Sequence, residues 1–70
     1  MAVRRMQDLV FTIEQWTADE AAIEEKLAEA SNAVVARAAF TAACRQRPTS
    51  VILLRHGIRV VEAQRPGTGR

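Results

Sequence analysis

Residues 17–47 read TADEAAIEEKLAEASNAVVARAAFTAACRQR, and this stretch decides which fold the chain can adopt. It is rich in alanine, glutamate and other strong helix formers. Thr17 and Glu20 match the capping-box pattern, in which the threonine and glutamate side chains accept backbone N–H groups at a helix start. Pro48 disfavours helical geometry at Arg47 and sets the end. We therefore predict a long helix from Thr17 to Arg47.

The two halves of this predicted helix differ in their apolar pattern. At about 100° per residue, the first half has one narrow apolar stripe, formed by Ile23, Leu27, Ala30 and Val34. From Val35 onward, apolar residues spread over a much wider arc. Either the helix breaks at Ser31-Asn32 and Ser31 caps a second helix, or it continues and its second half is covered from two sides. We favour a continuous or kinked helix.

Short strands are predicted before and after the helix. Residues 8–14 alternate between two faces, which indicates a half-buried strand. Its inward face would carry Leu9, Phe11 and Ile13, and its other face Val10, Thr12 and Glu14. Trp16 follows, and we expect it to cover the corner between strand and helix. Near the other end, the apolar runs 51–54 and 58–61 flank His56-Gly57 and predict a β-hairpin. A two-residue turn there would place Leu53 opposite Val60 and Ile52 opposite Val61.

These elements predict a single α+β domain over residues 1–70, with the order β-α-β-β. One long helix, continuous or broken at Ser31-Asn32, packs on a small three-stranded sheet that ends in the hairpin. We favour an antiparallel sheet in which the first strand lies beside the third. Residues 1–5 and 64–70 are expected to be disordered tails, since the latter contain Pro66, Gly67 and Gly69.

A chain of 70 residues buries too little surface to be comfortably stable as a lone monomer. With one cysteine the chain cannot form an internal disulfide, and one cysteine and one histidine are too few for an ordinary metal site. Oligomerisation is the remaining ordinary source of stability. Both faces of the predicted sheet are apolar at their centres, and one helix covers only one face. We therefore expect a homodimer.

The apolar second half of the helix supplies the predicted dimer interface. A helix that is apolar around most of its circumference needs cover on more than one side. The interface residues that this pattern selects are Val35, Ala36, Ala39, Phe40 and Ala43.

Charge is divided unevenly along the chain. Residues 1–35 carry three basic and seven acidic side chains, and residues 36–70 carry seven arginines and one glutamate. This division favours acid-to-base contacts between subunits, or an anionic partner at the basic end. The candidate contacts to an anion or a nucleic acid are Arg45, Arg47, Arg55 and Arg59. Phosphate binding by these arginines is the alternative to a purely protein-binding role.

Neither reactive side chain has a partner that the sequence places beside it. His56 has an unperturbed pKa near neutrality, but no carboxylate is positioned to orient it as a general base. Cys44 lies near a helix C-terminus, where the dipole raises the pKa of a thiol, so a small buried residue is the better interpretation. We predict no catalytic, cofactor-binding or metal-binding residue.

The location expected from sequence is the cytoplasm. A lone cysteine is typical of a reducing compartment. The apolar run 9–13 is too short for the core of a signal peptide and much too short to span a membrane. We expect no membrane association.

Two resemblances bear on function. A strand followed by two helices broken at Ser31-Asn32 is similar to ribbon-helix-helix DNA-binding modules, although the apolar hairpin has no place in that pattern. The segments 35–40, 45–48 and 52–60 resemble short bacterial proteins of unknown function, which implies no activity, substrate or site. We expect a small non-enzymatic interaction or regulatory protein that acts as a homodimer, with nucleic-acid binding as the alternative.

Overall fold

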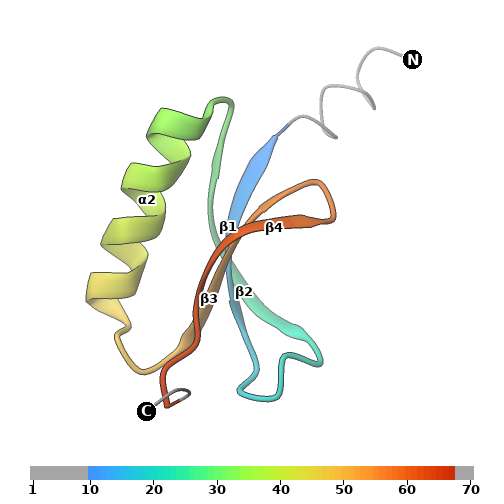
Figure 1. Ribbon diagram of the computed structural model, residues 1–70, viewed down its shortest axis with the longest axis vertical. Coiled ribbons are helices and arrows are strands. Elements are labelled where there is room, and N and C mark those ends of the chain that lie inside the picture. The colour runs from blue at the N-terminus through green and yellow to red at the C-terminus, as the bar shows by residue number, and fades with distance from the viewer. Residues whose placement is uncertain (1–9, 68–70) are drawn as a thin grey trace.

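The computed structural model of the protein describes residues 10–67. In this part of the chain, four strands and one helix follow the order β-β-α-β-β: β1 (Phe11–Trp16), β2 (Ile23–Ala30), α2 (Ala33–Gln46), β3 (Val51–His56) and β4 (Arg59–Gln64). The strands form one sheet with the spatial order β2-β1-β3-β4, and every neighbouring pair is antiparallel. Helix α2 lies along one face of this sheet (Figure 1). The α+β class is as predicted.

The predicted helix over residues 17–47 is wrong in its first half. Residues 23–30 form strand β2, which pairs with β1 at the edge of the sheet. The prediction of a three-stranded sheet fails for the same reason, because this segment supplies the fourth strand. Helix propensity is a weak preference, and pairing with a neighbouring strand overrides it here.

A loop replaces the predicted capping box. The backbone N–H of Thr17 donates to the carbonyl of Ala22 at 2.9 Å, which closes residues 17–22 into the connection between β1 and β2. The Thr17 hydroxyl oxygen accepts the N–H groups of Ala21 and Ala22 at 3.1 and 3.2 Å. Glu20 has a positive φ of 59° inside this loop. The threonine therefore organises a turn with the same kind of side-chain bond that caps a helix. Trp16 lies in β1 and adjoins no helix start.

The helix begins only after Ser31-Asn32, although we favoured a helix that continues through these residues or kinks at them. The Asn32 side-chain oxygen accepts the N–H of Val35 at 2.9 Å, so Asn32, not Ser31, is the N-cap of α2. At the other end, the N–H of Arg47 donates to the carbonyl of Ala43 at 2.9 Å. Pro48 follows directly, and the predicted end of the helix is confirmed.

The C-terminal hairpin is confirmed, but its register differs from the prediction. His56 pairs with Arg59, so the two turn residues are Gly57 and Ile58, and Gly57 takes the expected positive φ, 65°. The register shifts between Leu54 and Arg55, which places one extra residue in β4. As a result Leu53 faces Ala63, and Ile52 faces Gln64.

Strand β1 lies beside β3, the second strand of the predicted fold, and not beside the third. Because β2 reverses the chain before α2, the return into β3 runs antiparallel to β1. We expected an antiparallel sheet, and the sheet is antiparallel. The neighbour of β1 differs from the prediction because strand β2, which we did not predict, reverses the chain before α2.

The core lies between α2 and the sheet. Its largest fully buried side chains are Ile13, Ile52 and Leu54, and α2 contributes Ala36 and Ala43. Alanine at these two positions leaves little side-chain bulk between the helix and the strands. The predicted inward face of the first strand is confirmed for Phe11 and Ile13, whereas Leu9 lies outside the described residues.

The start of the predicted C-terminal tail is ordered. Gln64 is the last residue of β4, and its side-chain amide donates to the carbonyls of Arg47 and Ser50, each at 2.9 Å. Arg65 forms an ion pair with Glu20 at 2.6 Å. Residues 1–5, the other predicted tail, and residues 68–70 lie outside the described part.

Candidate functional site

Two of the four candidate arginines are held by carboxylates of the same chain. The guanidinium of Arg55 donates to both carboxylate oxygens of Glu14, at 2.8 and 2.9 Å. Arg47 donates to Glu25 at 2.9 Å and to the side-chain oxygen of Gln15 at 2.6 Å. Each of these two arginines is thus already paired with a carboxylate of its own chain.

The other two candidate arginines are exposed and lie far apart. Arg45 is in the last turn of α2, and Arg59 begins β4 directly after the hairpin turn. In Figure 1 the C-terminal end of α2 lies at the lower left and the turn between β3 and β4 at the upper right, on opposite sides of the molecule. The structure therefore does not bring the four arginines together into one basic surface.

The uneven charge along the chain is largely neutralised by folding. Three ion pairs join the acidic first half to the basic second half: Glu14–Arg55, Glu20–Arg65 and Glu25–Arg47. We expected such contacts between subunits, but one chain makes them by itself. The division of charge therefore supplies no argument for a partner.

The residues of the predicted dimer interface serve mainly the core of the single chain. Ala36 and Ala43 are buried, and Ala39 and Phe40 are half-buried against the same core. Only Val35 is exposed, at 54%. Whether these residues contact a second chain stays a prediction.

The outward face of α2 carries apolar side chains with no cover among the described residues. Val34 is 80% exposed, and Ala33, Ala38, Thr41 and Ala42 are exposed beside it. The only charged residues of α2 are Arg37 and Arg45. Surface helices ordinarily present charged and polar residues on this side.

On the face of the sheet opposite α2, a buried ion pair is covered by an aromatic ring. Directly paired residues of an antiparallel ladder share a face, so the pairings assign Thr12, Glu14, Trp16, Val51, Leu53 and Arg55 to this face. Trp16 Nε1 donates to Glu14 Oε1 at 3.0 Å, and the guanidinium carbon of Arg55 lies 5.4 Å from the centre of the Trp16 ring. We call Glu14, Trp16 and Arg55 the open-face cluster.

The open-face cluster explains why this face needs no second helix. Val51 and Leu53 are 8% and 4% exposed, although α2 packs on the other side. Leu53 pairs with Glu14 and Val51 pairs with Trp16 across the two strands. The Arg55 side chain extends along the strands over these pairs and contacts Glu14 and Trp16. The chain thus covers much of the apolar surface for which we expected a partner.

The charge of Glu14 is maintained despite its burial. Burial alone raises the pKa of this carboxyl, because it disfavours the charged form. The hydrogen bonds from Arg55 and Trp16 and the charge of Arg55 outweigh that effect, so the pKa of Glu14 lies below its ordinary value. The hydrogen bond to Glu14 likewise raises the pKa of Arg55. The pair is ionised at neutral pH and suits a structural role better than proton transfer.

His56 stacks on an aromatic ring, and Cys44 is in a setting that does not activate its thiol. The ring of His56 is stacked on Phe11, with centroids 4.2 Å apart and an angle of 7° between the planes. Cys44 is half-buried beside the core, where burial and then the charge of Glu62 raise the pKa of its thiol. A raised pKa lowers the thiolate fraction and with it the reactivity.

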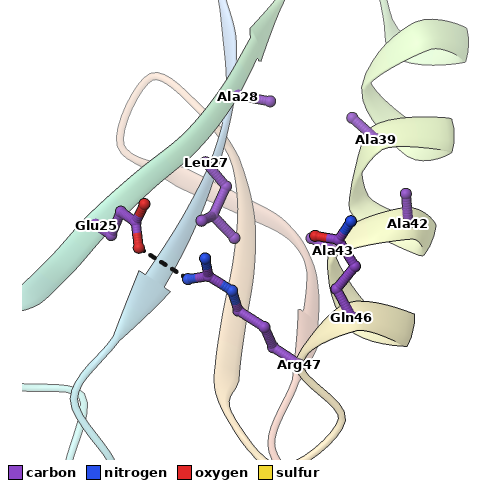
Figure 2. A pocket seen from close by; sticks show the side chains of 8 residues that line it. All are labelled: Glu25, Leu27, Ala28, Ala39, Ala42, Ala43, Gln46 and Arg47. Atoms are coloured by element: carbon purple, nitrogen blue, oxygen red, sulfur yellow. Dashed lines mark hydrogen bonds and ion pairs between the residues drawn. The ribbon is translucent and has the colours of Figure 1, made fainter.

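A cleft of about 350 Å³ lies between the edge strand β2 and α2. Leu27 points into it from β2, and alanines line the helix side (Figure 2). Both Leu27 and Ala28 can face the helix, because the pairing of β1 with β2 shifts here and leaves two residues opposite Ile13. The ion pair between Arg47 and Glu25 spans the mouth of the cleft (Figure 2).

Within residues 10–67, no three His, Cys, Asp or Glu side chains gather as a metal-binding group. In the same segment, no helix has the length and apolar character needed to cross a membrane. Searches of protein families, curated proteins and solved structures each found no match to this chain.

The sequence pointed to Arg55 but not to its partners. Glu14 and Trp16 carry no catalytic pattern, and their meeting with Arg55 depends on β1 lying beside β3. The one available signal was the alternation of residues 8–14, which places Glu14 two residues from Trp16 on one face.

Proposed function

We propose that the chain is a small, non-enzymatic interaction protein that acts as a homodimer, in which α2 of one copy packs against α2 of another. The outward face of α2 carries this proposal, because Val34 is 80% and Val35 is 54% exposed. Apolar side chains so exposed on a helix with few charges are typical of an interface. A cytoplasmic location, suggested by the single cysteine, belongs to the same proposal.

The shape of this face favours a symmetric, antiparallel arrangement of the two helices. Val34 and Val35 are the bulky residues near the start of α2, and Ala38, Thr41 and Ala42 are the small ones further along. Antiparallel pairing about Ala38 sets Val34 of each copy opposite Ala42 of the other, and Val35 opposite Thr41. Large residues then meet small ones, and both halves of the contact are equivalent, as a two-fold dimer requires.

Light scattering after size-exclusion chromatography tests the proposal. We expect twice the mass of one chain for the wild type, and one chain mass for Val34→Glu, because the contact would bury an unpaired charge. Ile58→Glu is the matched control, since Ile58 is an apolar residue 92% exposed at the hairpin turn. This variant is expected to stay dimeric. A monomeric wild type at concentrations of about 100 μM contradicts the proposal.

The nucleic-acid alternative has less support from the geometry. Arg47 and Arg55 are engaged within the chain, whereas Arg45 is in the last turn of α2 and Arg59 begins β4. Phosphate binding strong enough to matter needs several cations along one surface. We therefore retain the homodimer as the proposed function.

A further inference from the structure

Three connections of the chain meet at one end of the molecule and form a pocket of about 250 Å³. The loop between β1 and β2, the connection from α2 to β3 and the segment after β4 all lie at this end (Figure 1). We call it the loop-end pocket, and its lining includes Gln15, Trp16, Glu24, Thr49, Ser50 and Pro66.

The aromatic wall of the loop-end pocket is fixed in place. The indole of Trp16 is held at its nitrogen by Glu14, at 3.0 Å, and Arg55 packs over its ring. Both partners belong to the buried ion pair of the open-face cluster. An aromatic side chain anchored in this way loses little further freedom when a ligand packs against it.

The loop-end pocket has one ionisable lining residue, Glu24. In the described part of the chain, its carboxylate accepts a hydrogen bond from the side-chain amide of Gln15, at 2.7 Å. Apart from Glu24 and Asp19, each Asp or Glu of residues 10–67 has a basic partner: Glu14, Glu20, Glu25, Glu29 and Glu62. Within residues 10–67, Glu24 is therefore a carboxylate that lines a pocket and has no basic partner.

Nearby basic side chains do not neutralise this site. Arg47, Arg55 and Arg65 lie on neighbouring segments, but each is paired with a carboxylate of its own. Asp19, in the loop that ends at Glu24's strand, carries a second uncompensated negative charge; hydrogen bonds from the Thr17 hydroxyl and the Ala21 amide hold the pKa of its carboxyl below the ordinary value. Glu24 and Asp19 therefore place two negative charges on β2 and on the loop that precedes it.

We propose that the loop-end pocket binds an organic cation, an ammonium or guanidinium group, with Trp16 as its aromatic wall and Glu24 as its counter-ion. Cations are attracted to the face of an indole ring, and a carboxylate beside the ring adds a charge-assisted hydrogen bond. The hydroxyl groups of Thr49 and Ser50 offer further acceptors. A cavity below about 300 Å³ is small for a drug-sized ligand, and it suits one lysine or arginine side chain of a partner, or a free amine. The proposal does not depend on the homodimer.

Fluorescence of the protein tests this site directly, because Trp16 is the only tryptophan in the chain. The probes are the Nα-acetyl methylamides of lysine, arginine and norleucine, the last being an uncharged match for lysine. We expect a saturable change with lysine or arginine and none with norleucine. Glu24→Gln keeps an acceptor for Gln15 but removes the charge, and it should weaken binding about tenfold.

Glu29→Gln is the matched control, since Glu29 lies on the same strand and is paired with Lys26. Binding by this variant should equal that of the wild type. Equal responses to lysine and norleucine, or unchanged binding by Glu24→Gln, overturn the proposal, as does the absence of any saturable change. Comparing butylamine with an extended lysine-containing peptide then separates the two sources. Tighter binding of the peptide assigns the site to a protein partner, and equal binding assigns it to free amines.

Discussion

At the scale of single residues, the pair formed by Glu14 and Arg55 is the most consequential contact in the described chain. Glu14 is 3% exposed, and Arg55 donates to both of its carboxylate oxygens, while Trp16 donates to one of them. Breaking a buried ion pair from one side leaves an uncompensated charge. Arg55→Ala should therefore lower the free energy of unfolding by about 3 kcal/mol, measured by urea denaturation at pH 7.

The double variant Glu14→Gln with Arg55→Met provides the comparison. Removing both charges together leaves no buried ion, and glutamine keeps an oxygen for Trp16. The double variant should be more stable than Arg55→Ala alone. If it is less stable, the orphan charge of Glu14 is not what makes Arg55→Ala costly.

The same pair makes stability depend on pH in a definite window. The pKa of Glu14 is lower in the folded chain than its ordinary value of 4.5, so folding favours the ionised form. This contribution is complete above the unfolded-state pKa and is lost as pH falls through the lower, folded-state pKa. Below about pH 4.5, the wild type should lose stability more steeply than Glu14→Gln. Denaturant melts of both chains between neutral and acid pH measure the difference, and parallel curves would contradict it.

The sequence could predict the face of β1 on which Glu14 and Trp16 lie, but not that Arg55 would contact them. The alternation of β1 places Glu14 and Trp16 on one face, away from Ile13. Their burial depends on Arg55, which is 41 residues away from Glu14 in the chain and meets it through the pairing of β1 with β3. No local pattern contains that information.

At the scale of elements, the start of α2 gives a sharp test of where the strand ends and the helix begins. Asn32→Ala removes the oxygen that accepts the N–H of Val35, and it should cost about 1 kcal/mol of stability. Ser31→Ala is the control and should cost much less, because Ser31 is not the cap. Thermal melts followed by circular dichroism compare the two. Equal losses would indicate that the helix begins earlier than Ala33.

The missed strand shows why element type could not be predicted from residues 17–30. Residues 23–30 have high helix propensity, no apolar alternation, and mostly exposed side chains in the structure. An edge strand of this kind is specified by its partner β1, and its charges discourage pairing with further chains. The hairpin of β3 and β4 was predictable because its apolar runs and Gly57 act locally. Its register was not, because a bulge shifts it.

At the scale of the whole molecule, the sequence showed the charge division correctly but could not show where it would be neutralised. The three ion pairs that join the acidic half to the basic half lie within one chain. They form between segments that the sheet and the loop-end connections bring together. Only Arg45 and Arg59 among the four candidate arginines retain uncompensated charge in the described part. Of the two charged residues of α2, Arg37 is paired with Glu62 and Arg45 retains its charge, so a homodimer formed through α2 would bring few charges to the contact.

The affinity of such a dimer should depend little on salt concentration. Contacts between exposed opposite charges weaken as ionic strength rises, because the screening length falls from about 10 Å at 0.1 M to about 3 Å at 1 M. Apolar burial is not weakened in this way. If α2 packs on α2 through Val34, Val35 and Ala42, the dissociation constant of the dimer should change by less than about twofold between 0.1 and 1 M sodium chloride. Analytical ultracentrifugation at both concentrations measures it. A loss of affinity of about tenfold or more would instead indicate that acidic and basic surfaces of two chains meet, and the contact would have to be sought away from the outward face of α2.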